Sequence, residues 1–315
     1  MRINCETAAK RLLSADKIAI IAHRSPDGDT LGSAYALYYA LVNLGKTAKI
    51  LCSDPLPPQF SYLAASYEAA EFEEEFVTAV DVASAELLGV NLQQYADKVD
   101  LCIDHHHTNS GYAKETYVEG KWAAACELVY GVIRAMNAPV TPLIASCLYT
   151  GIATDTGCFK YPSTSANTHR IAADLTEAGA DYARINRELF DTKSKARVKI
   201  EQAVLESLGY AADGAIAYVC VTQQMLKESG AVESELDGVA AIPRMIEGVE
   251  IGITFREQTD GTFKVSIRTA QFADASAICA KFGGGGHVRA AGCRFSCGYE
   301  EALKSLLAAA ESELK

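Results

Sequence analysis

The chain has 315 residues, of which 49% are hydrophobic and 22% charged, which is typical of a globular protein with room for two domains. The formal net charge of −11 excludes attraction of nucleic acid by the overall field of the protein. Ten cysteines without a CxxC pair indicate reduced thiols in a cytoplasmic protein rather than a disulfide framework. The first residues form no apolar signal segment, and no apolar run reaches the length of a membrane span.

Short apolar strands alternate with helical patterns through the first half of the chain. Strands are predicted at 17–23, 47–52, 76–81 and 99–104, and helices at 5–15, 30–44, 122–136, 142–153 and 165–179. Such alternation indicates an α/β fold with a mostly parallel sheet flanked by helices. Ligands of these folds bind at the carboxyl ends of the strands.

The second half of the chain has a different pattern. Residues 181–209 are charged and helical, and strands follow in the sequences GAIAYVCVT, VEIGITFRE and FKVSIRTA. The turn QTDG predicts that the last two of these strands form a hairpin. Helices are predicted at 274–281 and 299–314. We therefore expect a catalytic domain at 1–185, a helical connector at 186–210 and a smaller α/β domain with a mixed sheet at 211–315.

Acidic and imidazole side chains follow the strands of the first domain. They are His23, Asp27 and Asp29 after the first strand, Asp81 after the third, and Asp104, His105 and His106 after the fourth, with Asp155 after a helix. Taken singly, such an Asp often forms a turn or caps a helix. Together they are expected to meet at one edge of the sheet, where the carboxylates would repel each other unless a cation neutralises them.

Mixed carboxylate and imidazole ligands favour Mn²⁺, with Mg²⁺, Co²⁺ or Zn²⁺ as alternatives. Several carboxylates in one cluster favour two ions, about 3.5–4 Å apart, that share an aspartate. Such a pair activates water and neutralises charge on a phosphoryl group, so the pattern predicts hydrolysis of a phosphate ester.

Four motifs carry a family resemblance, namely HRSPDGDTLGS, the Asp of AVD, IDHHH and ATDTG. In this order they resemble the DHH phosphoesterases, and KFGGGGHVRAAGC resembles the GGGH signature of the DHH-associated C-terminal domain. Size and domain order are most similar to the oligoribonucleases that also dephosphorylate 3′-phosphoadenosine 5′-phosphate (pAp).

The resemblance implies a role for each site residue. Metal ligands would be His23 and Asp27 for one ion, Asp29, His105 and Asp155 for the other, and Asp81 as the bridge. Asp104 would orient a histidine, and His106 would contact the scissile phosphate. Substrate would be bound by Arg268, Gly284, Gly285, Gly286, His287 and Lys160. The role of Arg289 stays open.

The leading hypothesis is hydrolysis of short oligoribonucleotides to mononucleotides and of pAp to AMP. The motifs equally allow a phosphodiesterase for cyclic dinucleotides such as cyclic di-AMP, or for the linear products pApA and pGpG. A nucleotide-binding protein without catalysis would be expected to lack Asp27 or Asp81. Expected partners are short single strands or small nucleotides, rather than long duplexes or membranes, and the relatives suggest a homodimer.

Overall fold

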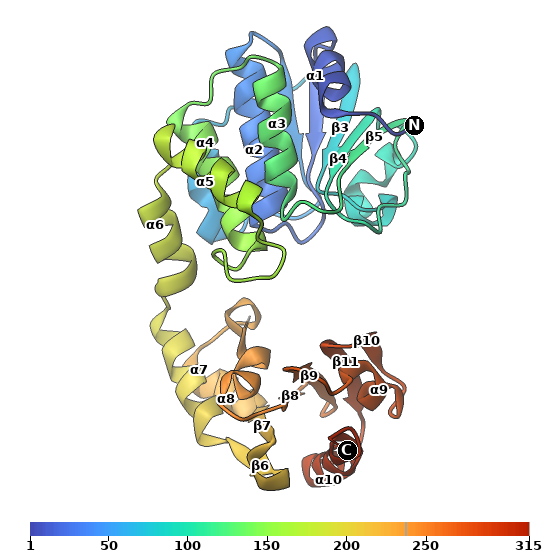
Figure 1. Cartoon of the computed structure of the whole chain (residues 1–315), viewed down its shortest axis with the longest axis vertical. Coiled ribbons are helices and arrows are strands. Elements are labelled where there is room, and N and C mark those ends of the chain that lie inside the picture. The colour runs from blue at the N-terminus through green and yellow to red at the C-terminus, as the bar shows by residue number, and fades with distance from the viewer. Residues whose placement is uncertain (237, 315) are drawn as a thin grey trace. The chain divides into compact units, whose positions relative to one another are not determined.

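The computed structural model describes residues 1–236 and 238–314, and the chain divides into two compact units, Met1–Thr192 and Lys193–Lys315 (Figure 1). Each unit contains one β-sheet with helices packed on it. Among the described helices, none is both long and apolar enough to cross a membrane.

The sheet of the first unit is parallel throughout, with the strand order β2-β1-β3-β4-β5. Its strands are β1 (Ile18–Ile21), β2 (Ala48–Leu51), β3 (Phe76–Val80), β4 (Leu101–Asp104) and β5 (Glu115–Val118). All four side chains of β1 are buried, as expected for a strand covered on both faces. The predicted fold class is confirmed, and β5 adds an edge strand that the sequence did not predict.

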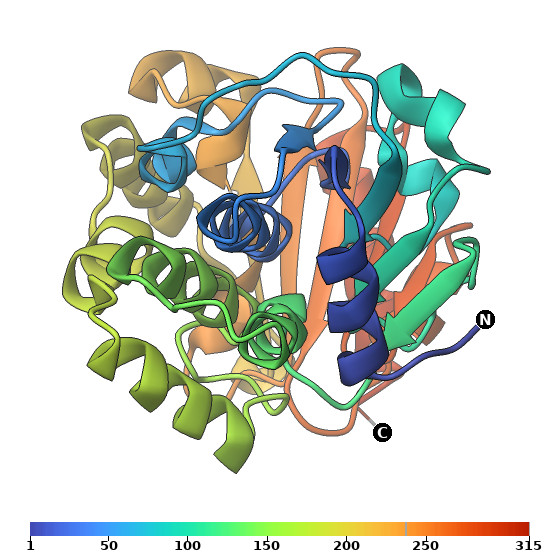
Figure 2. The same cartoon turned by 90° about the horizontal axis from the view of Figure 1, so that it is seen from above.

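The two faces of this sheet are covered differently. The helices are α1 (Cys5–Ser14), α2 (Gly28–Asn43), α3 (Ala125–Ala135), α4 (Pro142–Asp155), α5 (Ala166–Glu177) and α6 (Tyr182–Asn186). They form one core with Ile18 and Ile20, whereas Ala19 and Ile21 face the short 3₁₀ helices within 85–95. Figure 2 shows the α-helices of the first unit on one side of its strands and these short 3₁₀ helices on the other. Side-chain alternation along β1 therefore separates two cores.

Helices α2 and α4 pack so closely that side chains are excluded between them. A Cβ atom on Gly32 of α2 would lie 2.4 Å from the Cys147 carbonyl oxygen of α4. A Cβ atom on Gly151 of α4 would lie 2.7 Å from the Asp29 carboxylate. These glycines allow the approach that brings Asp29 of α2 near Asp155, the last residue of α4.

The second unit contains a mixed sheet with the order β10-β11-β9-β8-β7-β6, in which β7 and β8 are the parallel pair. Its strands are β6 (Gly209–Ala211), β7 (Ile216–Val221), β8 (Ile251–Glu257), β9 (Phe263–Thr269), β10 (Gly285–His287) and β11 (Ala290–Phe295). Its helices are α7 (Lys195–Glu206), α8 (Gln223–Ser229), α9 (Ala275–Ala280) and α10 (Tyr299–Glu311). The predicted hairpin is confirmed, since β8 and β9 pair in antiparallel fashion.

Alternation along β9 gives this strand a core face and a polar face. Phe263, Val265 and Ile267 are buried in the core that includes α9 and α10. The intervening residues Lys264, Ser266 and Arg268 are more exposed. The polar face therefore carries positive charge.

Candidate active site

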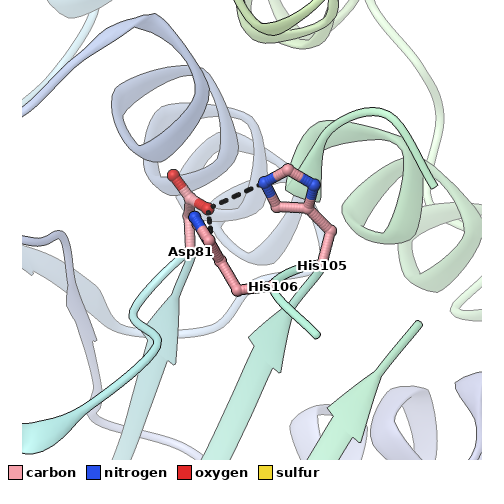
Figure 3. Close-up of side chains that lie close together, drawn as sticks. All are labelled: Asp81, His105 and His106. Atoms are coloured by element: carbon pink, nitrogen blue, oxygen red, sulfur yellow. Dashed lines mark ion pairs between the residues drawn. The ribbon is translucent and has the colours of Figure 1, made fainter. Parts of the chain in front are cut away.

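The predicted acidic and imidazole side chains meet at the carboxyl ends of β1, β3 and β4. His23 lies just beyond β1, Asp81 directly follows β3, and His105 and His106 directly follow β4. Figure 3 shows Asp81, His105 and His106 turned toward one another above these strands. Asp81 adopts a positive φ of 59°, which is uncommon for a residue other than glycine and is often found at functional sites.

His105 stands at the centre of the cluster. Its Nε2 atom lies 3.3 Å from Asp155 Oδ2, 3.5 Å from Asp81 Oδ1 and 3.7 Å from Asp29 Oδ2. On the other side of Asp81, the Nε2 atom of His23 lies 3.5 Å from Asp81 Oδ2. Asp81 thus lies between the two imidazoles, with one carboxylate oxygen toward each.

Three overlapping groups of side chains have the spacing of a metal site, with ligand atoms within 4.8 Å of one another. They are His23 with Asp27 and Asp81, Asp29 with His105 and Asp155, and Asp81 with His105 and His106. All six residues predicted as metal ligands occur in these groups. Asp81 belongs to two of these groups and His105 to two, so neighbouring groups share a side chain, as adjacent cations with a common ligand would.

Asp29 is held by the N-terminus of α3. Its carboxylate is fully buried and accepts hydrogen bonds of 2.6 Å from the Ala125 N–H and 2.9 Å from the Cys126 N–H. The first N–H groups of a helix have no partners within the helix, so they favour a carboxylate. This contact fixes Asp29 between α2 and α3.

Backbone carbonyl groups orient two of the imidazoles. The Nδ1 atom of His23 lies 2.7 Å from the Arg24 carbonyl oxygen, and that of His105 lies 3.2 Å from the Trp122 carbonyl oxygen. A proton on each Nδ1 atom satisfies these contacts and leaves Nε2 with a free lone pair toward the carboxylates. This arrangement is common for metal-binding histidines.

Asp104 has a different role from the other carboxylates. It is fully buried, and its Oδ1 atom accepts hydrogen bonds from the N–H and, at 2.8 Å, from the Nδ1 atom of His106. Asn109 donates to its other oxygen at 2.6 Å. These contacts position His106, and nothing in the sequence indicated Asn109.

The electrostatics of the cluster favour a cation. Burial raises the pKa of Asp81 to about 7 and that of Asp155 to about 8, and repulsion between neighbouring carboxylates adds to both shifts. The Oδ1 atom of Asp81 and the Nε2 atom of His105 are buried without a hydrogen-bond partner. A divalent cation would satisfy both atoms and restore the charged form of the carboxylates, so the donor set fits such an ion.

A cavity of about 420 Å³ opens onto the cluster. Its lining includes His23, Arg24, Asp27, Asp81, His106 and Asp155. Sequence reasoning overlooked Arg24, although it directly follows a predicted ligand. Its N–H donates a hydrogen bond of 2.7 Å to the Leu87 carbonyl oxygen, and it adds a residue with a permanent positive charge to the lining of the cavity.

The predicted substrate residues Arg268 and His287 of the second unit lie on β9 and β10, which flank β11. Residues 285–287, within the GGGH signature, form the exposed edge strand β10. In register, His287 pairs with Ala290, and Ala290 pairs with Arg268. Paired residues share a face, so Arg268 and His287 are on the same side of the sheet, with only the Ala290 methyl group between them.

The remaining predicted substrate residues have different positions. Gly284 precedes β10 and lies against β11, where a Cβ atom would be 2.2 Å from the Gly292 carbonyl oxygen. Close packing therefore explains this glycine. Lys160 is exposed in the segment between α4 and α5 and is not among the residues that line the cavity.

The sequence model of the DHH family N-terminal domain matches residues 17–152, and that of the DHHA1 domain matches residues 213–315. The bifunctional oligoribonuclease and PAP phosphatase NrnA of Thermus thermophilus is 32% identical, covering 94% of this chain and 90% of the relative. The probable protein of the same name from Streptococcus mutans is 27% identical over 91% and 92% of the two chains. The crystal structure of an exopolyphosphatase-related protein from Bacteroides fragilis has a TM-score of 0.85 at 26% identity and covers 98% and 95% of the two chains.

Proposed function

Since this chain belongs to the DHH family, we propose that it is a metal-dependent phosphoesterase that hydrolyses short oligoribonucleotides to mononucleotides and pAp to AMP. The observation that carries the proposal is the pair of buried atoms without hydrogen-bond partners, Asp81 Oδ1 and His105 Nε2, at the centre of the carboxylate cluster. The names of the relatives support the choice of substrate.

Two divalent cations, preferably Mn²⁺, would be held by the six clustered residues. His23 and Asp27 would bind one ion, Asp29, His105 and Asp155 the other, and Asp81 both. When bound, the ions would activate the attacking water and neutralise charge on the phosphoryl oxygens. Carboxylate and imidazole ligands suit Mn²⁺, and Mg²⁺ or Co²⁺ would be alternatives.

The other residues around the cavity would act on the phosphate directly. His106, oriented by Asp104, would donate a hydrogen bond to the scissile phosphate or to the leaving oxygen. Arg24 would contribute a guanidinium group to the same phosphate, which favours charge-assisted hydrogen bonds. Neither residue is needed to bind a cation in this arrangement.

Arg268 and His287 would bind the nucleotide on the polar face of the second sheet. Strand β10 is the edge strand of this sheet, and backbone N–H groups at a sheet edge suit a phosphate. The ten free cysteines favour a reducing compartment, which supports action in the cytoplasm.

A hydrolysis panel with added Mn²⁺ and a chelator control tests the proposal. It would contain a dinucleotide, a short oligoribonucleotide, a long strand, cyclic di-AMP, pAp and pyrophosphate. We expect metal-dependent release of mononucleotides from the short substrates and of AMP from pAp, with the long strand almost untouched. Preference for cyclic di-AMP or pyrophosphate would contradict the choice of substrate, and absence of any hydrolysis would contradict the enzymatic function.

A further inference from the structure

Phe272 lies in the segment between β9 and α9, and 62% of its surface is exposed. A single exposed aromatic side chain is ordinary on a protein surface. Phe272 differs from such a residue because hydrogen bonds hold the backbone of the segment 270–273 to two other parts of the second unit.

The first set of hydrogen bonds is made by Glu250, a residue that is only 7% exposed. Its Oε1 atom accepts hydrogen bonds of 2.8 Å from the N–H groups of both Phe272 and Ala273, and 3.1 Å from that of Gln271. Burial alone raises the pKa of Glu250, but these N–H groups and the positive charge of Arg289 together lower it. A buried, charged carboxylate thus holds three successive backbone N–H groups.

The second set of hydrogen bonds joins the segment to the turn that follows β10. Arg289 donates a hydrogen bond of 2.8 Å to the Ala273 carbonyl oxygen, and the Ala275 N–H donates one of 2.8 Å to the Val288 carbonyl oxygen. This gives Arg289, whose role the sequence left open, a positioning function. The backbone that carries the exposed ring of Phe272 is therefore held to the turn that follows His287.

The same segment adjoins the row of residues formed by Arg268, Ala290 and His287. Arg268 lies four residues before Phe272 in the chain, at the end of β9. Strands lie about 4.8 Å apart, so the backbones of Arg268 and His287 are about 10 Å apart across Ala290. This distance is large enough for a phosphate group and its ribose to lie across the row. An aromatic ring beside the row would then be in a position to contact the base. Figure 1 shows β9, β10, β11 and α9 gathered in this part of the second unit.

We propose that Phe272 is a stacking platform for the nucleobase of a nucleoside monophosphate whose phosphate is bound by Arg268 and His287. This inference rests on the proposed function and extends it by assigning the base-binding residue. Every nucleobase has a π face, so a stacking platform accepts any base and selects for the presence of a base rather than for its identity. Degradation of short strands of any sequence requires such tolerance.

The test compares AMP with ribose 5-phosphate, which lacks the base, by calorimetric titration of the full chain loaded with Mn²⁺. We expect Phe272→Ala to weaken AMP binding about tenfold, because loss of one aromatic stack costs that much or more. Binding of ribose 5-phosphate should not change. Phe272→Trp should retain AMP affinity, and AMP should quench the fluorescence of the added indole.

The control is Tyr210→Ala, which removes a ring that is 52% exposed on β6, at the opposite edge of the same sheet. This variant should bind both ligands as the unaltered chain does. Equal AMP affinity of Phe272→Ala and Tyr210→Ala would overturn the inference, as would an equal loss of both ligands in Phe272→Ala. Titration does not require turnover, so AMP binding without hydrolysis would refute the proposed function and leave the stacking site standing.

Discussion

The Oδ1 atom of Asp104 lies 2.8 Å from the Nδ1 atom of His106, and the carboxylate is completely buried. This contact fixes the ring of His106. Unlike His23 and His105, His106 is not assigned as a ligand of a predicted cation, so its Nε2 atom is left for the substrate. The contact links the end of β4 to the chemistry proposed for the cavity. Buried carboxylates that orient an imidazole commonly control both its direction and its basicity.

Replacement Asp104→Asn should therefore reduce kcat by about 10- to 100-fold while the content of bound Mn²⁺ is retained. The amide removes the negative charge beside His106 but keeps the shape of the side chain. Steady-state kinetics together with elemental analysis of the protein would measure both quantities. Loss of metal in parallel with activity would mean that Asp104 is itself a ligand.

Replacement Asp81→Ala should abolish turnover and remove at least one bound cation, because this carboxylate would be shared by both ions. Elemental analysis after dialysis against Mn²⁺ would measure the loss. Asp97→Ala, at an exposed position outside the cluster, is the matched control and should keep full metal content. An active Asp81→Ala variant would refute the proposed metal centre.

Replacement Arg24→Gln should lower kcat/KM by about tenfold or more, since a hydrogen bond between two charged groups is lost. The effect should be larger for pAp than for a dinucleotide, because a phosphate monoester carries more negative charge than a diester. Arg170→Gln makes the same change at an exposed position on α5 and should leave the kinetics unchanged. If both variants behave alike, Arg24 does not contact the substrate.

Replacement Arg268→Ala should raise KM and leave metal content intact, because this side chain lies on the sheet of the second unit. Lys264→Ala, on the same face of the same strand, is the control for a general loss of positive charge. Kinetics with pAp would distinguish the two. Loss of metal at unchanged substrate affinity would show that the position assigned to Arg268 in binding is wrong.

Replacement Glu250→Gln should destabilise the second unit by about 2 kcal/mol at neutral pH, since hydrogen bonds from three N–H groups lose their charged acceptor. The pKa of Glu250 is lowered in the folded chain, so its stabilising effect is full above the ordinary glutamate pKa of about 4.3 and disappears as pH falls below that value. Urea unfolding of both proteins at neutral and acidic pH measures this. Glu247→Gln, an exposed neighbour, should show no difference at either pH.

The gathering of acidic and imidazole side chains at one edge of the first sheet was predictable because its signals are local. Buried apolar runs mark β1, β3 and β4, and the residues that follow them carry the donors. Parallel strands bring such residues to one edge without further information. The DHH family resemblance was visible in the same segments and is confirmed over both units.

Other features depend on partners that are distant in the sequence. Strand β5 is short and begins with Glu115, and it exists because β4 pairs with it. The run of glycines is a strand only because β11 lies beside it. Nothing in the local sequence of Asn109 or Glu250 indicates the groups that they bind. Tertiary contacts decide each of these, and local propensity does not.

The hydrogen bonds between Asp29 and the first residues of α3 span almost a hundred positions of the chain. During synthesis on the ribosome, the aspartate emerges long before the N–H groups that hold it. A nascent chain that ends before α3 presents His23, Asp27 and Asp81 but leaves Asp29 without its anchor and lacks Asp155 altogether. The proposed metal centre would therefore be completed only at a late stage of translation, and a product truncated before α3 would lack Asp155 and the anchor of Asp29.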